Sequence, residues 1–183
     1  MTPSVHIPVL PQEILNLGSP QPGQTWVDGT GGGGGHCQLI MERIGEAGRL
    51  LAIDRDPAAA DRLSHLLPSP AVVRNASYDQ TPELLQQLNW PPADGILLDL
   101  GLSSDQLADR ERGFSFQFDG ELDMRFDTNS GEPAWEWLSR VDERTLADTI
   151  FRYGRSVSAG ASRNASSKCV RRIQFAPQAN FAN

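Results

Sequence analysis

The stretch TWVDGTGGGGGH, residues 25–36, decides the fold of this 183-residue chain. Its first four residues predict a short buried strand, and Leu39, Ile40 and Ile44 follow at helical spacing. The glycines in between let the backbone approach a ligand closely and leave N–H groups at the start of the helix. The stretch therefore predicts a strand, a ligand-binding loop and a helix, in that order.

Strands and helices keep alternating after the glycine loop. Further strands are predicted at residues 49–54, 71–74 and 94–100, with helices at residues 57–66, from Thr81 onward and, later in the chain, at residues 134–153. Alternation of this kind predicts right-handed crossovers and a parallel sheet. The fold class is therefore expected to be α/β.

An acidic residue closes three of the predicted strands: Asp28, Asp54 and Asp99. A parallel sheet binds its ligand at the carboxyl ends of its strands, near the point where the strand order reverses. We therefore expect the three carboxylates and the glycines to meet at one edge of the sheet and to form the binding site.

Composition limits the class of protein. A hydrophobic content of 39% without any apolar run of membrane-spanning length indicates a globular domain with no membrane partner. The two cysteines, Cys37 and Cys169, form no paired motif, and the N-terminus has no secretory pattern, so we expect a cytoplasmic protein without a metal site. The net charge of −7 opposes a nucleic-acid partner, yet the residues after Gly154 carry five basic side chains and no acidic one.

The glycine run contains a formal G-x-G-x-x-G at Gly29, Gly31 and Gly34, which is typical of dinucleotide binding. Asp28 argues against a dinucleotide, because a carboxylate beside the loop would repel a pyrophosphate. The same carboxylate would attract the ammonium group and the sulfonium of S-adenosyl-L-methionine. An NAD(P)-binding oxidoreductase and a simple tight turn remain the alternatives at this point.

Three other residues have a functional and a structural interpretation each. Asp54 is placed to accept hydrogen bonds from a ribose diol, or else forms a polar turn with Asp56, which suits helix capping. Tyr78 offers a ring on which an adenine can pack, or is an exposed loop residue. His36 either lines the cofactor pocket or lies on the surface.

Several motifs then appear in a fixed order between residues 6 and 154. They are HIPVL at residues 6–10, DGT at 28–30, GGH at 34–36, AIDRDP at 52–57, DGILLDLG at 94–101, ERGFSF at 111–116, LDMR at 122–125 and YG at 153–154. Together they resemble the bacterial 16S ribosomal RNA cytosine-N4 methyltransferase family. The run from Arg112 to Arg125 is long and unusual, which makes the resemblance specific.

The resemblance implies a class I, Rossmann-like methyltransferase fold with a helical insertion after the fourth strand. It implies S-adenosyl-L-methionine as cofactor, no metal, and methylation of N4 of a cytidine in the decoding region of 16S ribosomal RNA, so that this RNA or the small ribosomal subunit is the partner. The implied cofactor contacts are Gly34, Gly35, His36, Asp54, Tyr78, Asp99 and Gln106. Spacing alone gives Asp99 and Gln106 no role, but Asp99 is also our candidate catalytic residue, as an acceptor for the N4 hydrogen.

The chain departs from the family pattern in four respects. The family usually has fewer glycines in the loop, phenylalanine at Tyr78, proline at Asp105, and, after Gly154, an acidic pair, a basic helix, further insertion helices and the closing strands of the sheet. The last departure predicts a truncation or frameshift, with a cofactor-binding part at 1–100, the start of an inserted substrate-recognition subdomain at 101–154 and an aberrant or disordered tail at 155–183. An inactive fragment that binds nucleosides weakly is therefore the alternative to an active enzyme, and the oligomeric state is not predicted.

Overall fold

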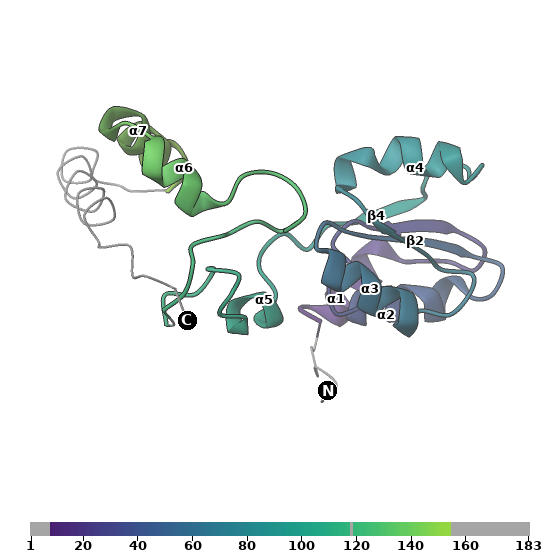
Figure 1. Cartoon of the computed structure of the whole chain (residues 1–183). Helices are drawn as coiled ribbons and strands as arrows, with labels where there is room; N and C mark the ends of the chain where they lie inside the picture. Colours follow the sequence, from purple (N-terminus) through teal and green to yellow (C-terminus); the bar gives the residue numbers. More distant parts are fainter. Residues whose placement is uncertain (1–7, 118, 155–183) are drawn as a thin grey trace. The chain divides into compact units, whose positions relative to one another are not determined.

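The computed structural model describes residues 8–117 and 119–154, which form two compact units (Figure 1). The first unit contains the described residues up to Asp109 together with Phe126–Ser130. The second unit contains Arg110–Arg125 and the described residues from Gly131 on. The predicted tail at 155–183 lies outside the described residues, and the predicted domain boundaries stay predictions.

A four-stranded parallel sheet forms the centre of the first unit, with the strand order β3-β2-β1-β4. The order reverses between β1 and β4, because β2 and β3 are added on one side of β1 and β4 on the other. The α/β fold predicted from the sequence is confirmed. The strands are β1 (Thr25–Asp28), β2 (Arg49–Asp54), β3 (Val72–Asn75) and β4 (Gly95–Leu97).

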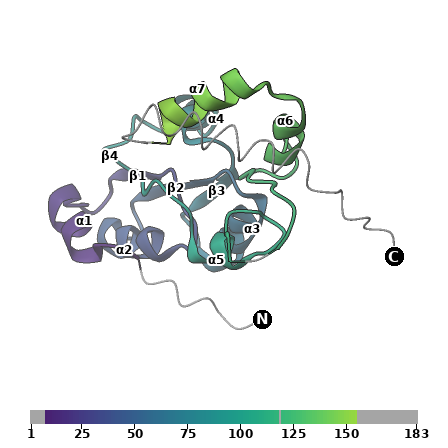
Figure 2. The ribbon, with the colours of Figure 1, turned by 90° about the vertical axis from the view of Figure 1, so that its left-hand side faces the viewer.

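Helices cover both faces of this sheet (Figure 1, Figure 2). Helices α2 (Gly35–Ile44) and α3 (Pro57–Leu66) pack on one face, and α4 (Thr81–Gln87) packs on the other. Alternate strand residues point to the two faces, as the period of a strand requires. The core beneath α2 and α3 holds Trp26, Cys37, Ile40, Ile44, Leu50, Ala52, Leu63 and Leu67, and the core beneath α4 holds Val27, Leu51, Ile53, Leu84 and Leu85.

Helix α3 begins where the sequence predicts. The Asp56 side chain accepts a hydrogen bond from the Ala58 N–H at 3.0 Å, and Pro57 occupies the first turn, where its missing N–H costs nothing. The capping role of Asp56 is confirmed. This cap fixes the turn between β2 and α3, which carries Asp54.

Two predicted elements differ in length from the structure. Strand β4 is three residues long, not seven, because its pairing with β1 ends at the Asp28–Leu97 register. The predicted helix at 134–153 is two helices of the second unit, α6 (Ala134–Arg140) and α7 (Glu143–Tyr153). Asp142 starts α7 by accepting hydrogen bonds from Thr145, and Val141 before it is extended.

Short elements that the sequence did not indicate complete the description. They are α1 (Pro11–Gly18), the 3₁₀ helix η1 (Tyr78–Gln80) and α5 (Ser104–Ala108), all of them in the first unit. None of the helices in the described part of the chain is long and apolar enough to cross a bilayer.

Candidate functional site

The candidate site lies at the carboxyl edge of the sheet, where the sequence places it. The glycine loop at residues 29–34 follows β1, Asp54 closes β2, Tyr78 follows β3, and Asp99 comes two residues after β4. The glycine loop and Asp99 therefore flank the point where the strand order reverses, which is where open parallel sheets bind ligands.

The glycine loop is fixed by hydrogen bonds to the end of β2. The Gly31 N–H donates to the Ile53 carbonyl at 2.9 Å, and the Gly32 N–H donates to Asp54 Oδ2 at 2.7 Å. Gly34 has a φ of 81°, and a Cβ there would lie 2.5 Å from Leu66 Cδ2. Glycine at position 34 thus permits both the left-handed turn into α2 and the close approach of the loop to α3.

Asp54 connects this loop to the turn that follows β2. Its Oδ2 accepts from Gly32, and its Oδ1 accepts from the Asp56 N–H at 2.8 Å. Burial raises the pKa of the Asp54 carboxyl, and the two N–H donors oppose this rise. A carboxylate has about four acceptor positions, so each oxygen of this partly exposed side chain retains capacity to accept from a ribose hydroxyl.

Asp28 has a different role from the one expected. Its side chain is 1% exposed, Oδ1 accepts from the Thr30 N–H at 3.1 Å, and Oδ2 accepts from the Cys37 thiol at 3.1 Å. Burial raises the pKa of Asp28, and burial with the nearby Asp28 carboxylate raises that of Cys37 well above its usual value. The expectation that Asp28 meets the ammonium group of a ligand is therefore wrong, because its carboxylate is turned inward and supports the loop.

His36 and Asp99 approach each other across the strand-order reversal. His36 Nε2 lies 2.9 Å from the Val9 carbonyl, which can only accept, so Nε2 carries the hydrogen and Nδ1 faces Asp99 Oδ2 at 4.0 Å. The His36 side chain is 8% exposed and that of Asp99 is 40% exposed. The surface interpretation of His36 is thus wrong, and Asp99 presents its carboxylate to solvent at the site.

Gln106 and Tyr78 differ in how accessible their side chains are to a ligand. Gln106 is buried, with Nε2 donating to Asp56 Oδ2 at 3.1 Å and Oε1 accepting from the Ser103 N–H at 3.0 Å, so both ends of its amide hold α5 in place. A cofactor contact from Gln106 stays a prediction. Tyr78 is half exposed, and its Cβ lies beside Gly29.

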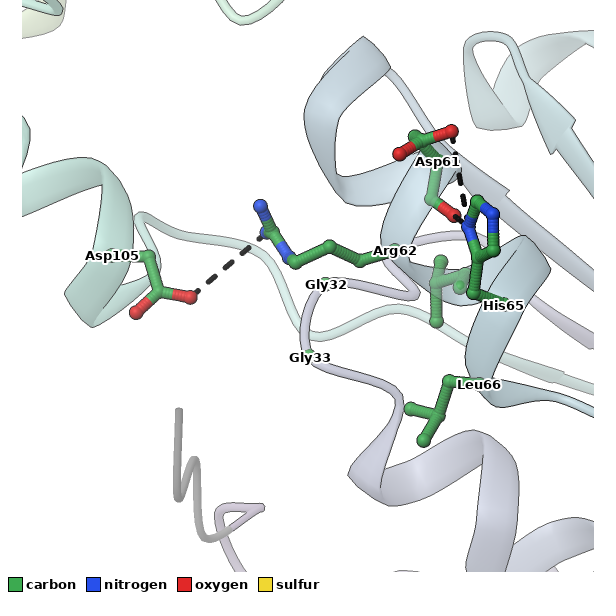
Figure 3. Close-up of a pocket in the computed structure, with 8 residues that line it drawn as sticks. Gly32, Gly33, Asp61, Arg62, His65, Leu66 and Asp105 are labelled. Carbon is green, nitrogen blue, oxygen red and sulfur yellow. Dashed lines mark hydrogen bonds and ion pairs between the residues drawn. The ribbon is translucent and has the colours of Figure 1, made fainter. Parts of the chain in front are cut away.

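A surface hollow of about 440 Å³ lies beside the glycine loop (Figure 3). Arg62 reaches across it toward Asp105, with Nη2 and Oδ2 at 3.9 Å. Both side chains are nearly half exposed, so this pair contributes only about 0–1 kcal/mol. None of the seven predicted cofactor residues lines the hollow, which is bounded by Gly32, Gly33, Asp61, Arg62, Leu63, His65, Leu66 and Asp105.

A model of the MraW methylase family matches residues 3–177 of the chain. The chain belongs to the MraW methylase family. The resemblance to a ribosomal RNA methyltransferase family is thereby confirmed, and the parallel sheet described above is the MraW family's class I methyltransferase fold.

Two curated relatives illustrate the similarity. Ribosomal RNA small subunit methyltransferase H of Rhodopirellula baltica is 44% identical over 160 residues, which cover 81% of this chain and 49% of the relative. The protein of the same name from Nitrosospira multiformis is 45% identical over 149 residues, which cover 81% of this chain and 47% of the relative. The chain thus spans about half the length of the curated relatives it matches.

The structure of this MraW family chain adds residues to the site that were not predicted from the sequence. Thr30 Oγ1 accepts a hydrogen bond from the Asp99 N–H at 2.7 Å, and Cys37 supports Asp28 from within α2. Thr30 had a signal in the sequence, because it is the only hydroxyl residue within a run of glycines. Cys37 had none, because a single cysteine on the apolar face of a helix is ordinary core composition.

Proposed function

We propose that this chain carries the cofactor-binding part of an S-adenosyl-L-methionine-dependent methyltransferase that modifies small-subunit ribosomal RNA. One observation carries the proposal: the glycine loop, Asp54, His36 and Asp99 lie together at the carboxyl edge of the sheet, where the strand order reverses. The chain also belongs to the MraW family. The names of the relatives support ribosomal RNA as the substrate. The finer proposal is transfer to N4 of a cytidine in the decoding region of 16S RNA, in the cytoplasm.

The residues at this edge fit the cofactor. Asp54 retains acceptor capacity for a ribose diol, and the half-exposed ring of Tyr78 offers a surface for an adenine. The exposed Asp99 carboxylate suits a cationic amino acid moiety better than a pyrophosphate, which favours S-adenosyl-L-methionine over a dinucleotide. When bound, S-adenosyl-L-methionine supplies an electrophilic methyl group on a sulfonium.

Catalysis then depends on how the protein positions and polarises the target base. The N4 lone pair of cytosine is delocalised into the ring, so an acceptor for an N4 hydrogen makes the nitrogen a better nucleophile. Asp99 is our candidate for that acceptor, because its carboxylate is exposed beside the glycine loop while its backbone is held by Thr30. Most of the rate is expected from holding the reacting atoms in line, and the target base has to be extruded or unpaired.

Two measurements on the purified chain test the proposed function. Isothermal titration calorimetry with S-adenosyl-L-methionine, S-adenosylhomocysteine, NAD and NADP is expected to give binding for the first two alone. Transfer of a labelled methyl group to small ribosomal subunits then separates an active enzyme from a fragment that only binds the cofactor. Binding of NAD or NADP, with no response to S-adenosyl-L-methionine, would overturn the proposal in favour of an oxidoreductase.

Asp99→Asn tests the catalytic role. We expect methyl transfer at saturating cofactor and RNA to fall about 10²- to 10⁴-fold, because the amide is a poorer acceptor for the N4 hydrogen. The matched control is Glu46→Gln, the same change at an exposed turn between α2 and β2, at the opposite edge of the sheet. Unchanged turnover with weakened cofactor affinity would show that Asp99 binds the cofactor and does not act on the base.

A further inference from the structure

We propose that Thr30 is a positioning residue whose hydroxyl holds Asp99 in register with the glycine loop. The inference rests on the proposed function, since the position of Asp99 matters to a ligand only if this edge of the sheet binds one. Thr30 is not one of the predicted cofactor contacts, so this role is additional to theirs.

The hydrogen bonds of Thr30 give it this role. Its Oγ1 accepts from the Asp99 backbone N–H at 2.7 Å and lies 3.4 Å from Asp28 Oδ1, to which it donates. The Thr30 N–H also donates to Asp28 Oδ1, at 3.1 Å. A hydroxyl has one donor hydrogen and two acceptor lone pairs. Because the Asp99 N–H can only donate, a lone pair of the hydroxyl is directed to Asp99, and the hydroxyl hydrogen is left for Asp28.

The anchor of this arrangement is buried. Asp28 is 1% exposed, and its second carboxylate oxygen accepts from Cys37, which is fully buried within α2. The hydrogen bonds therefore run from the core through Asp28 and Thr30 to Asp99. Thr30 thus connects the buried Asp28 carboxylate to the partly exposed Asp99.

The segment that carries Asp99 needs such a tie. The backbone pairing of β4 ends at Leu97, whose carbonyl accepts from the Gly29 N–H at 2.9 Å. Leu98 and Leu100 on either side of Asp99 are 42% and 66% exposed. After Leu97 the backbone hydrogen bonds of the sheet end, and the Thr30 hydroxyl then attaches Asp99 to the glycine loop.

If Thr30 holds Asp99 in place, the affinity for the cofactor depends on the Thr30 hydroxyl. Misplacing a binding or catalytic group by about 1 Å can cost about 10²-fold in rate. Thr30→Val removes the hydroxyl and keeps the branched shape, whereas Thr30→Ser keeps the hydroxyl. We expect Thr30→Val to weaken the binding of S-adenosylhomocysteine about tenfold or more, and Thr30→Ser to change it less than about threefold.

A double-mutant cycle in the full chain tests whether Thr30 acts through Asp99. Asp99→Ala removes the carboxylate but leaves the backbone N–H, so Thr30→Val should have little further effect on affinity in that background. The affinity of each variant is measured by calorimetry, and the melting temperature is recorded to show that the variant is folded. An equal loss of affinity from Thr30→Val with and without the Asp99 carboxylate would overturn the proposal, because Thr30 would then act on the loop as a whole.

Hydrogen exchange at the Asp99 amide, followed by NMR, gives a readout that needs no ligand. We expect Thr30→Val to speed this exchange about tenfold or more relative to the unaltered chain, and Thr30→Ser to preserve its protection. Equal protection in all three proteins would overturn the positioning role. If the unaltered chain binds neither S-adenosyl-L-methionine nor S-adenosylhomocysteine, the proposed function fails, and the exchange rates alone then decide whether Thr30 holds Asp99.

Discussion

Gly34→Ala is expected to lower the free energy of unfolding by about 2–5 kcal/mol and to abolish cofactor binding. A side chain at positive φ costs about 1–2 kcal/mol, and forcing a methyl group into a packed contact costs about 1–3 kcal/mol more. The new Cβ would lie 2.5 Å from Leu66 Cδ2 and 3.1 Å from Leu63 Cδ2, so the loop or α3 has to move. Either movement disturbs the hydrogen bond between Gly32 and Asp54.

Gly45→Ala is the matched control for this prediction. Gly45 lies just after the other end of α2, has a φ of 65°, and a Cβ there would have no neighbour within 4 Å. Its ψ of −172° places it in a backbone region that is essentially limited to glycine, so we expect only the cost of that conformation, about 1–3 kcal/mol, and no change in cofactor affinity. Urea unfolding of both variants measures the difference. Equal losses of stability would show that contact with α3 does not explain the need for Gly34.

Asp54→Ala is expected to weaken S-adenosylhomocysteine binding at least about a hundredfold. Hydrogen bonds to a charged group contribute about 1.5–3 kcal/mol each, and two bonds to a ribose diol would be lost together. The change also removes the acceptor for the Gly32 and Asp56 N–H groups, so the loop loses its attachment to the end of β2. Calorimetry measures the affinity, and urea unfolding measures the accompanying loss of stability.

Asn75→Ala separates these two effects. The Asn75 side chain donates to the carbonyls of Asp54 and Arg55, so its removal loosens the same turn and leaves the carboxylate in place. We expect the affinity to fall by less than about tenfold, since the carboxylate still accepts from the ribose. A loss as large as that of Asp54→Ala would mean that the turn, and not the Asp54 carboxylate, determines binding.

The fold was predictable because its signals are local in the sequence. Strands that are buried on both faces give short apolar runs, such as residues 49–54, and glycine or proline marks their ends. The edge at which Asp54 and Asp99 lie follows from the parallel topology alone, since every strand of such a sheet points the same way. The local strand signals and the parallel topology therefore locate the site without any knowledge of side-chain contacts.

The direction in which each side chain points was not predictable in the same way. Asp28 is turned toward Cys37 of α2, and Gln106 is held by Asp56, which is far from it in the sequence. Both orientations depend on tertiary contacts between elements that no local pattern connects. The lengths of β4 and of the helices at 134–153 were missed for a related reason, because pairing partners and caps end these elements before their composition changes.

The strand order β3-β2-β1-β4 bears on how the protein acquires its fold as it leaves the ribosome. Strand β2 pairs with β1, β3 with β2, and β4 with β1, so each emerging strand finds a neighbour that has already been synthesised. Domains generally fold as units, and the N-terminal ones fold first during synthesis. A nascent polypeptide stalled just after β4 clears the exit tunnel already contains every strand of the described sheet, so the sheet can form as one unit while translation continues.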